Sequence, residues 1–252
     1  MHIRLTALTF AVIGGALSMG TAGAARAANV GYYVGPSCTF TIGDFAGAIT
    51  TAGHTPIAVT TLDAPSLTGL GGLVIETCSA APVANASVNA AVASGMGLVI
   101  NTWNAGPGSG VALPGAPAAT FSSYYSNGFC GLDSSIPAGS PVTSGPGGTL
   151  NDSSLDSSGF CALDSFATSN SLPVGAIPFV TTTDANQVGA FGYSSGQGRV
   201  AFSSMSMATL LPGGSDSGGA GSLSGGLNTY LINAIAWVAG PTTTCASEGY
   251  KG

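Results

Sequence analysis

Positively charged side chains are scarce in this sequence. Its 252 residues include four Lys and Arg against ten Asp and Glu, and charged residues of both signs make up only 6% of the chain. A surface so poor in cations cannot neutralise a phosphate backbone or attach to anionic lipid. Nucleic-acid binding is therefore excluded, and neutral polar side chains must cover most of the surface.

A hydrophobic run long enough to span a membrane is also missing. The N-terminal apolar stretch, residues 5–17, is about 13 residues long, whereas a membrane-spanning helix needs about 20. It follows the basic start His2 to Arg4 and precedes small residues ending in Ala27, an order typical of a secretory signal peptide. We expect cleavage near Ala27, no transmembrane anchor, and a mature protein that is secreted, periplasmic or on a bacterial cell surface.

Histidine is nearly absent, and this limits catalysis. After the leader only His54 remains, next to a glycine that ends a predicted helix, where an imidazole commonly caps backbone groups. The segment from Gly192 to Gly196 matches the G-x-S-x-G pattern of serine hydrolases, but no histidine follows Ser194. No C-x-x-C or H-x-x-x-H spacing is present, so the sequence predicts no metal site and no cofactor.

The acidic residues of the loops have no EF-hand spacing. Calcium binding remains open for them, but we interpret them as solvated carboxylates that cap turns; they are Asp133, Asp152, Asp156 and Asp164.

Five cysteines remain after cleavage, and an even subset should pair in an oxidising compartment. Residues 127–134 and 158–165 agree at six of eight positions, so Cys130 and Cys161 have similar surroundings and are one predicted pair. Cys38 and Cys78 each follow the end of a predicted strand and are the other. The role of Cys245 stays open.

Short apolar runs alternate with helix-like segments, which predicts an α/β fold with a mostly parallel sheet and flanking helices. The leader covers residues 1–27, one α/β domain covers 28–240, and a short polar tail covers 241–252. Within the domain, residues 105–170 are rich in Gly, Pro and Ser and are expected to form an insertion of short strands and turns held by a disulfide. The predicted strands are residues 29–34, 55–60, 72–77, 97–102, 176–181, 187–193 and 199–204. The predicted helices are residues 44–52, 85–94 and 227–238, the last preceded by a flexible connector over 213–226.

Three segments carry a resemblance to a known family: Ala-Gly-His at 52–54, Leu-Val-Ile-Glu at 73–76, and Ala-Ser-Gly-Met-Gly-Leu-Val-Ile at 93–100. With residues 141–145 and 198–204 they resemble the class I glutamine amidotransferase-like, or ThuA-like, flavodoxin-like domain. That resemblance implies a cysteine nucleophile on the turn after 97–102 and a histidine and an acid late in the chain. Here the turn holds Trp103 and Asn104, so the resemblance implies the fold without its catalytic residues, a pseudoenzyme.

Ligands of open α/β sheets bind at the carboxyl ends of the strands. The residues predicted to line such a crevice are Cys38, Glu76, Cys78, Trp103 and Asn104. We expect a non-catalytic binding or surface-assembly module whose partner is a small molecule, a glycan or a surface component. Two alternatives stay open. One is a secreted glycoside or ester hydrolase using carboxylates near the strand ends, with Asp44, Asp63 and Glu76 as candidates, and the other is a structural cell-surface protein.

Overall fold

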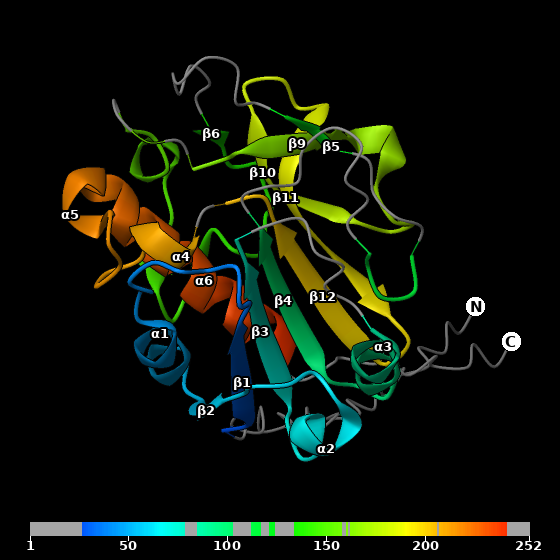
Figure 1. Ribbon diagram of the computed structural model, residues 1–252. Coiled ribbons are helices and arrows are strands. Elements are labelled where there is room, and N and C mark those ends of the chain that lie inside the picture. The colour runs from blue at the N-terminus through cyan, green and yellow to red at the C-terminus, as the bar shows by residue number, and fades with distance from the viewer. Residues whose placement is uncertain are drawn as a thin grey trace, which may run out of the picture.

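The fold is built around one large twisted sheet (Figure 1). The computed structural model describes residues 27–78, 85–102, 112–116, 121–123, 134–157, 160, 162–205 and 207–240. Across the sheet the strands lie in the order β2 (Thr55–Ala58), β1 (Asn29–Val34), β3 (Gly72–Thr77), β4 (Gly97–Thr102), β12 (Gly198–Ser203), β11 (Gln187–Ser195), β10 (Ile177–Thr182) and β6 (Ser134–Ser135). Two further strands, β9 (Ser165–Thr168) and β5 (Phe121–Ser123), join this sheet through β11.

The first five strands in that order are parallel, and the strands beyond β12 run antiparallel. The predicted α/β fold with a parallel central sheet and flanking helices is confirmed. The hairpin of β11 and β12 turns at Gly196, whose φ of 59° favours glycine because that residue has no Cβ.

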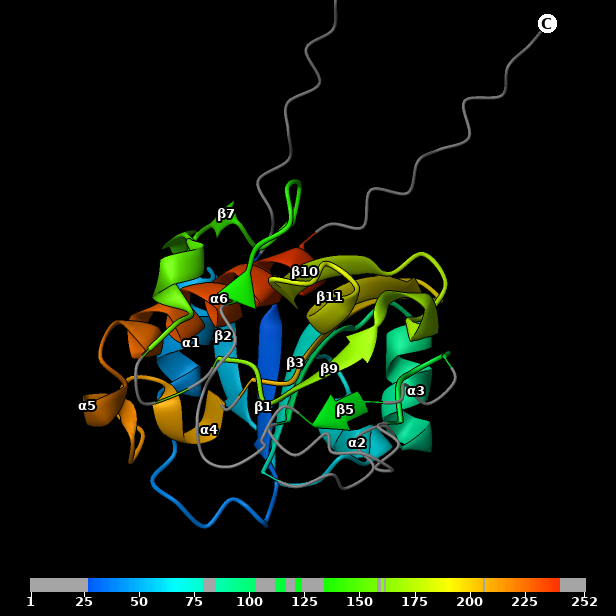
Figure 2. The same ribbon diagram turned by 90° about the horizontal axis from the view of Figure 1, so that it is seen from above.

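Helices cover both faces of the sheet (Figure 2). On one face lie α1 (Phe45–Thr51), α4 (Met207–Leu210), α5 (Ser217–Ala220) and α6 (Ser222–Ala239), and on the other lie α2 (Ala64–Leu67) and α3 (Ala86–Ala93). The side chains of β3 and β4 alternate between the two resulting cores, Val74 and Val99 towards α6, and Leu73 and Leu98 towards α3. Burial on both faces explains the continuous apolar runs of these strands.

Local capping sets where two of the predicted helices begin. Asp44 Oδ1 accepts the Gly47 backbone N–H at 2.7 Å at the start of α1, and Asn85 Oδ1 accepts that of Val88 at 2.9 Å at the start of α3. Both helices therefore lie within the predicted ranges.

The prediction of a flexible connector over residues 213–226 is wrong. This run forms α5 and the first turns of α6. A Cβ on Gly226 would overlap the backbone carbonyl of Ser154, so the glycine lets α6 pack closely against the 3₁₀ turn η1 (Asp152–Ser154). Tertiary contact overrides the weak helix propensity of glycine here.

The described part of the insertion contains short strands and turns, as expected. In addition to β5, β6 and β9, it holds a small separate hairpin of β7 (Ser144–Gly145) and β8 (Gly148–Thr149). The predicted Cys130–Cys161 disulfide lies outside the described residues. Among those described, no helix combines the length and the apolar character needed to cross a membrane.

Candidate functional site

A row of polar side chains crosses three neighbouring strands near their carboxyl ends. Glu76 of β3 is in register with Asn101 of β4, which is in register with Ser203 of β12. All three project to the face covered by α6. They lie two residues beyond Val74, Val99 and Ala201, which pack on that face, and side chains two apart in a strand share a face. Ser203 Oγ donates to Asn101 Oδ1 at 2.6 Å, so two members of the row are linked.

Glu76 is the most unusual member of this row. Its side chain is 0% exposed, and neither carboxylate oxygen has a hydrogen-bond partner among the described residues. Burial raises the pKa of Glu76 well above its usual value, and the negative charge of Asp164 raises it further. An ionised carboxylate without a partner would be strongly unfavourable here, so Glu76 retains its proton to a higher pH than an exposed glutamate.

Asp164 is the second carboxyl group of the site. It precedes β9, and its backbone N–H donates to the Ser204 carbonyl at 3.0 Å, directly after β12. Although the residue is partly exposed, its Oδ2 is closed to solvent and has no hydrogen-bond partner in the described part of the chain. Burial raises the pKa of Asp164 to about 8.

The two carboxyl groups lie close enough to act on each other. Burial raises the pKa of both, and the charge of Asp164 raises the pKa of Glu76 further. Two neighbouring buried carboxyl groups do not readily ionise together, so ionisation of one opposes ionisation of the other. The expectation that Asp164 is a solvated loop carboxylate is wrong, because the fold places it against the sheet.

Further polar atoms at this edge are buried without a hydrogen bond to any described residue; they are Thr77 Oγ1, Asn101 Nδ2, Thr102 Oγ1 and Ser165 Oγ. Burial raises the pKa of Tyr230 of α6, and an interaction of its hydroxyl with the side chain of Ser203 partly offsets that rise. Buried polar groups in proteins are nearly always satisfied, so this concentration of unused donors and acceptors distinguishes the strand ends from the rest of the core.

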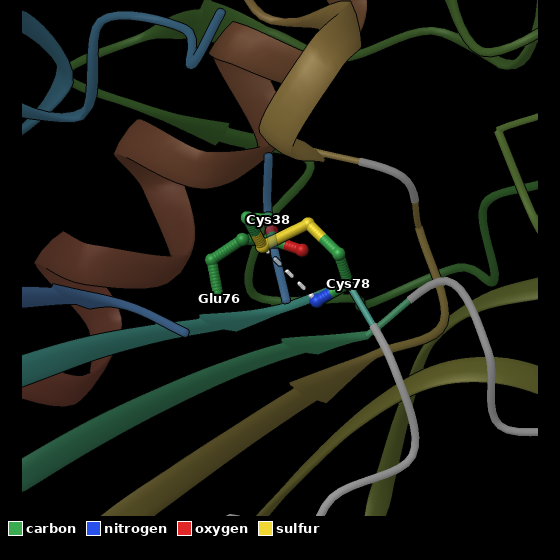
Figure 3. Close-up of side chains that lie close together, drawn as sticks. All are labelled: Cys38, Glu76 and Cys78. Atoms are coloured by element: carbon green, nitrogen blue, oxygen red, sulfur yellow. Dashed lines mark hydrogen bonds between the residues drawn. A yellow bond between two sulfur atoms is a disulfide. The ribbon is translucent and has the colours of Figure 1, made fainter. Parts of the chain in front are cut away.

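A disulfide between Cys38 and Cys78 lies beside Glu76 (Figure 3). The Cα atoms of the two cysteines are 5.1 Å apart, and the Cys78 backbone N–H donates to Cys38 Sγ at 3.2 Å. One carboxylate oxygen of Glu76 and both sulfur atoms lie within 4.8 Å of one another. The predicted pairing of these cysteines is confirmed, and the bond keeps both sulfurs from acting as thiolate ligands of a metal ion.

The other predicted crevice residues, Trp103 and Asn104, lie outside the described residues, as does Cys245. Cys38, Glu76 and Cys78 come together as expected, and whether they line a ligand crevice stays a prediction.

His54 lies at the opposite edge of the sheet from Glu76. It directly precedes β2, and its Nδ1 accepts the backbone N–H of Ala28 at 3.3 Å, so the predicted capping role is confirmed. Burial lowers the pKa of His54.

Four further acidic residues accept hydrogen bonds from backbone N–H groups. Asp44 caps α1 and Asp63 caps α2, while the carboxyl that acts on Glu76 is Asp164. Asp152 Oδ1 accepts the N–H of Ile136 at 2.9 Å, and Asp156 Oδ1 accepts that of Ser134 at 2.8 Å. These two carboxylates hold the chain around β6 through contacts between residues 16 and 22 positions apart, which differs from the predicted capping of local turns. Asp133 lies outside the described residues.

Ser194 lies inside the β11–β12 hairpin, opposite Arg199. A hydrolase nucleophile needs a sharp turn from a strand into a helix, so the G-x-S-x-G match has no catalytic context. Sequence reasoning missed Asp164, Ser203 and Tyr230 at the site. Only Asp164 had been singled out, as part of the repeated octet, and nothing local indicates its burial.

No protein-family model matches the chain, and a search of curated proteins finds no match. The chain is similar to a number of solved structures, including the following two. One is a β-galactosidase from Rahnella sp. R3, with 11% identity and a TM-score of 0.47 over 84% of this chain and 31% of the galactosidase. The other is a putative ThuA-like protein from Parabacteroides merdae ATCC 43184, with 11% identity and a TM-score of 0.43 over 85% of this chain and 90% of that one. This chain thus spans less than a third of the length of the galactosidase. Neither likeness carries an argument about activity. Membership of the amidotransferase-like family stays a prediction.

Proposed function

We propose that the mature chain is an exported α/β module without hydrolytic activity, which binds a small molecule, a glycan or a surface component at the carboxyl ends of its parallel strands. The position of His54 is the observation that carries this proposal. General-base catalysis requires the base within hydrogen-bond reach of the group that it deprotonates, about 3 Å between heavy atoms or through one water. The single imidazole of the mature chain is bonded to Ala28 at the other edge of the sheet, and the cysteines next to Glu76 are held in a disulfide.

The unused polar atoms around Glu76 support a binding role. Asn101 Nδ2, on the same face of the sheet as Glu76, and Thr102 Oγ1, next to it on the opposite face, are buried without partners in the described part of the chain. A buried polar group without a partner destabilises a protein by about 1 to 3 kcal/mol. A ligand that supplies the missing hydrogen bonds would remove that penalty; because Asn101 and Thr102 are 0% and 1% exposed, the strand ends must open to admit it. The carboxyl ends of parallel strands are where α/β sheets usually bind ligands.

Two features support export. The first 27 residues have the order of a secretory signal peptide, and the Cys38–Cys78 disulfide is typical of an oxidising compartment. Mass spectrometry of protein recovered from the medium or periplasm of an expressing bacterium should give an N-terminus at Ala28. A mature mass that retains the leader would contradict the export proposal.

The binding proposal is tested with mature protein and a panel of glycans and small polar metabolites, screened by thermal shift. A ligand found this way should bind the Thr102→Val variant about tenfold more weakly, a change of about 1.4 kcal/mol. The control is Thr182→Val, which removes a hydroxyl that is already hydrogen-bonded to Gln187. Equal affinity for both variants and the wild type would place the ligand elsewhere.

A secreted hydrolase remains the second candidate, and the two carboxyl groups with raised pKa values favour it. Glycosidases use one carboxyl group that holds its proton and one that is ionised, and Glu76 and Asp164 could divide these roles. Against it, Glu76 has no exposed surface from which to reach a substrate. Turnover of any member of a glycoside and ester panel that Glu76→Gln abolishes would establish the hydrolase and overturn the binding proposal.

A further inference from the structure

The Cys38–Cys78 disulfide differs from an ordinary structural cross-link in its surroundings. A buried carboxyl group lies beside it, with an oxygen of Glu76 within 4.8 Å of both sulfur atoms and no hydrogen-bond partner among the described residues (Figure 3). A cross-link needs no acid next to its sulfurs. An acid can speed the breaking of a disulfide where the sulfur that leaves is buried, because a buried thiolate is unfavourable and protonation removes its charge.

The two sulfurs are not equivalent. Cys38 is half-buried on a turn closed by its own N–H to the Gly35 carbonyl at 3.0 Å, whereas Cys78 is buried at the end of β3. The Cys78 backbone N–H donates to Cys38 Sγ, so it would also stabilise negative charge on that sulfur. Cys38 is therefore the sulfur that an incoming thiolate can reach.

We propose that Cys38–Cys78 is a redox-active disulfide that exchanges with external thiols at Cys38, with Glu76 as the proton donor to Cys78. In the first step an external thiolate attacks Cys38 Sγ, a mixed disulfide forms, and the Cys38–Cys78 bond breaks. The electron pair goes to Cys78 Sγ, which takes the proton of Glu76. In the second step another external thiolate attacks the external sulfur of the mixed disulfide, and Cys38 leaves as a thiolate.

The overall change balances. Two external thiols become one external disulfide, and the protein disulfide becomes two thiols. The protons released by the external thiols restore the proton of Glu76 and protonate Cys38. The reverse sequence oxidises the protein again, with Glu76 taking back the proton of Cys78.

The state of Glu76 suits this role. A proton donor must hold its proton until the sulfur leaves, and Glu76 does so because burial and then the charge of Asp164 raise its pKa. No described side chain is hydrogen-bonded to its carboxyl group, so none of them competes with the sulfurs for its proton. The inference goes beyond the proposed binding function and is independent of it, since the experiments below use no ligand.

The first test follows reduction of Cys38–Cys78 in native, mature protein by dithiothreitol, with thiol alkylation and peptide mass spectrometry to separate this bond from the other cysteines. The rate should rise in proportion to dithiothreitol without denaturant. Glu76→Gln should slow it on the order of 10²-fold, the usual contribution of a general acid. The control is Asp63→Asn, which removes an exposed carboxylate but keeps a good helix cap.

A rate that does not depend on dithiothreitol, or reduction only in denaturant, would show a structural cross-link and overturn the proposal. So would an unchanged rate in a folded Glu76→Gln variant.

The second test needs no variant of Glu76 and applies even if that variant does not fold. Wild-type protein and Cys78→Ser are incubated with oxidised and reduced glutathione and quenched with acid. Mass spectrometry should find glutathione on Cys38, and the control variant Cys38→Ser should carry at least tenfold less on Cys78. Preferential labelling of Cys78 would overturn the assigned direction of attack.

Discussion

Glu76 shows how a single residue can depart from the pattern of the element that holds it. Its neighbours in β3 build the two cores of the molecule, yet at this position a carboxyl group is fully enclosed without a hydrogen-bond partner among the described residues. The sequence predicts that Glu76 lies at the end of a strand and close to Cys78, and the structure confirms both positions. The burial depends on α6 and on the segment around Asp164, which are far away in the sequence.

The stability of the protein should fall as the pH rises. Each raised pKa means that the folded state holds a proton that the unfolded state releases, so stability is complete below the ordinary carboxyl pKa and is lost as pH rises through the folded value. For Asp164 that window runs from 3.8 to about 8. Unfolding in urea at about pH 5 and about pH 8 should show the loss, with a slope of up to about 1.4 kcal/mol per pH unit for each proton.

Glu76→Gln and Asp164→Asn should each reduce this loss. The control is Asp63→Asn, since hydrogen bonding to Ser66 lowers the pKa of exposed Asp63 and it titrates below this window. A wild-type protein that is equally stable at both pH values would show that neither carboxyl group is buried as described.

Two threonines test whether an unused hydroxyl is unfavourable at the strand ends. Thr102 Oγ1 is buried without a partner among the described residues, so Thr102→Val should raise the free energy of unfolding by about 1 kcal/mol. Thr182 Oγ1 donates to Gln187 Oε1 at 2.9 Å and accepts the Asp184 N–H at 3.0 Å, so Thr182→Val should lower it by about 1 to 2 kcal/mol. Chemical denaturation measures both, and destabilisation of equal size would mean that Thr102 is satisfied.

Helix α6 illustrates how much of an element the local sequence can predict. The apolar stripe of residues 227–238 predicts its second half correctly, because large side chains recur with the helical period. Its first turns are rich in Gly and Ser and resemble a linker. They are helical because α6 packs against the turn at Ser154, a contact that the local sequence does not reveal.

Two adjacent glycines of α6 should respond in opposite directions to alanine. Gly225 is exposed, and a Cβ there would meet nothing within 4 Å, so Gly225→Ala should stabilise the protein by about 0.8 to 1 kcal/mol. Gly226→Ala would drive a methyl group into the Ser154 carbonyl and should destabilise by about 1 to 3 kcal/mol. Urea denaturation compares them, and stabilisation by both would show that α6 does not pack against η1.

At the scale of the whole molecule, the disulfide links the loop after β1 to the end of β3. The two cysteines are separated by 40 residues, and closing a loop of that size stabilises a protein by about 4 kcal/mol through the entropy of the unfolded chain. Cys38→Ser combined with Cys78→Ser should therefore lower the free energy of unfolding by about that amount. Urea denaturation in oxidising buffer measures it, with Cys245→Ser as the control, and an unchanged stability would contradict a cross-link in the folded protein.

The sequence by itself determined the α/β class, the parallel strands β1 to β4, the helices capped by Asp44 and Asn85, and the pairing of Cys38 with Cys78. Those features follow from periodicity, caps and strand ends, which are local. Only the tertiary structure decided that Asp164 lies against the sheet near Glu76, because that contact joins segments far apart in the sequence. The pKa values of both carboxyl groups depend on this enclosure. The tertiary structure also decided that His54 Nδ1 accepts the backbone N–H of Ala28, since that contact joins residues 26 positions apart in the sequence.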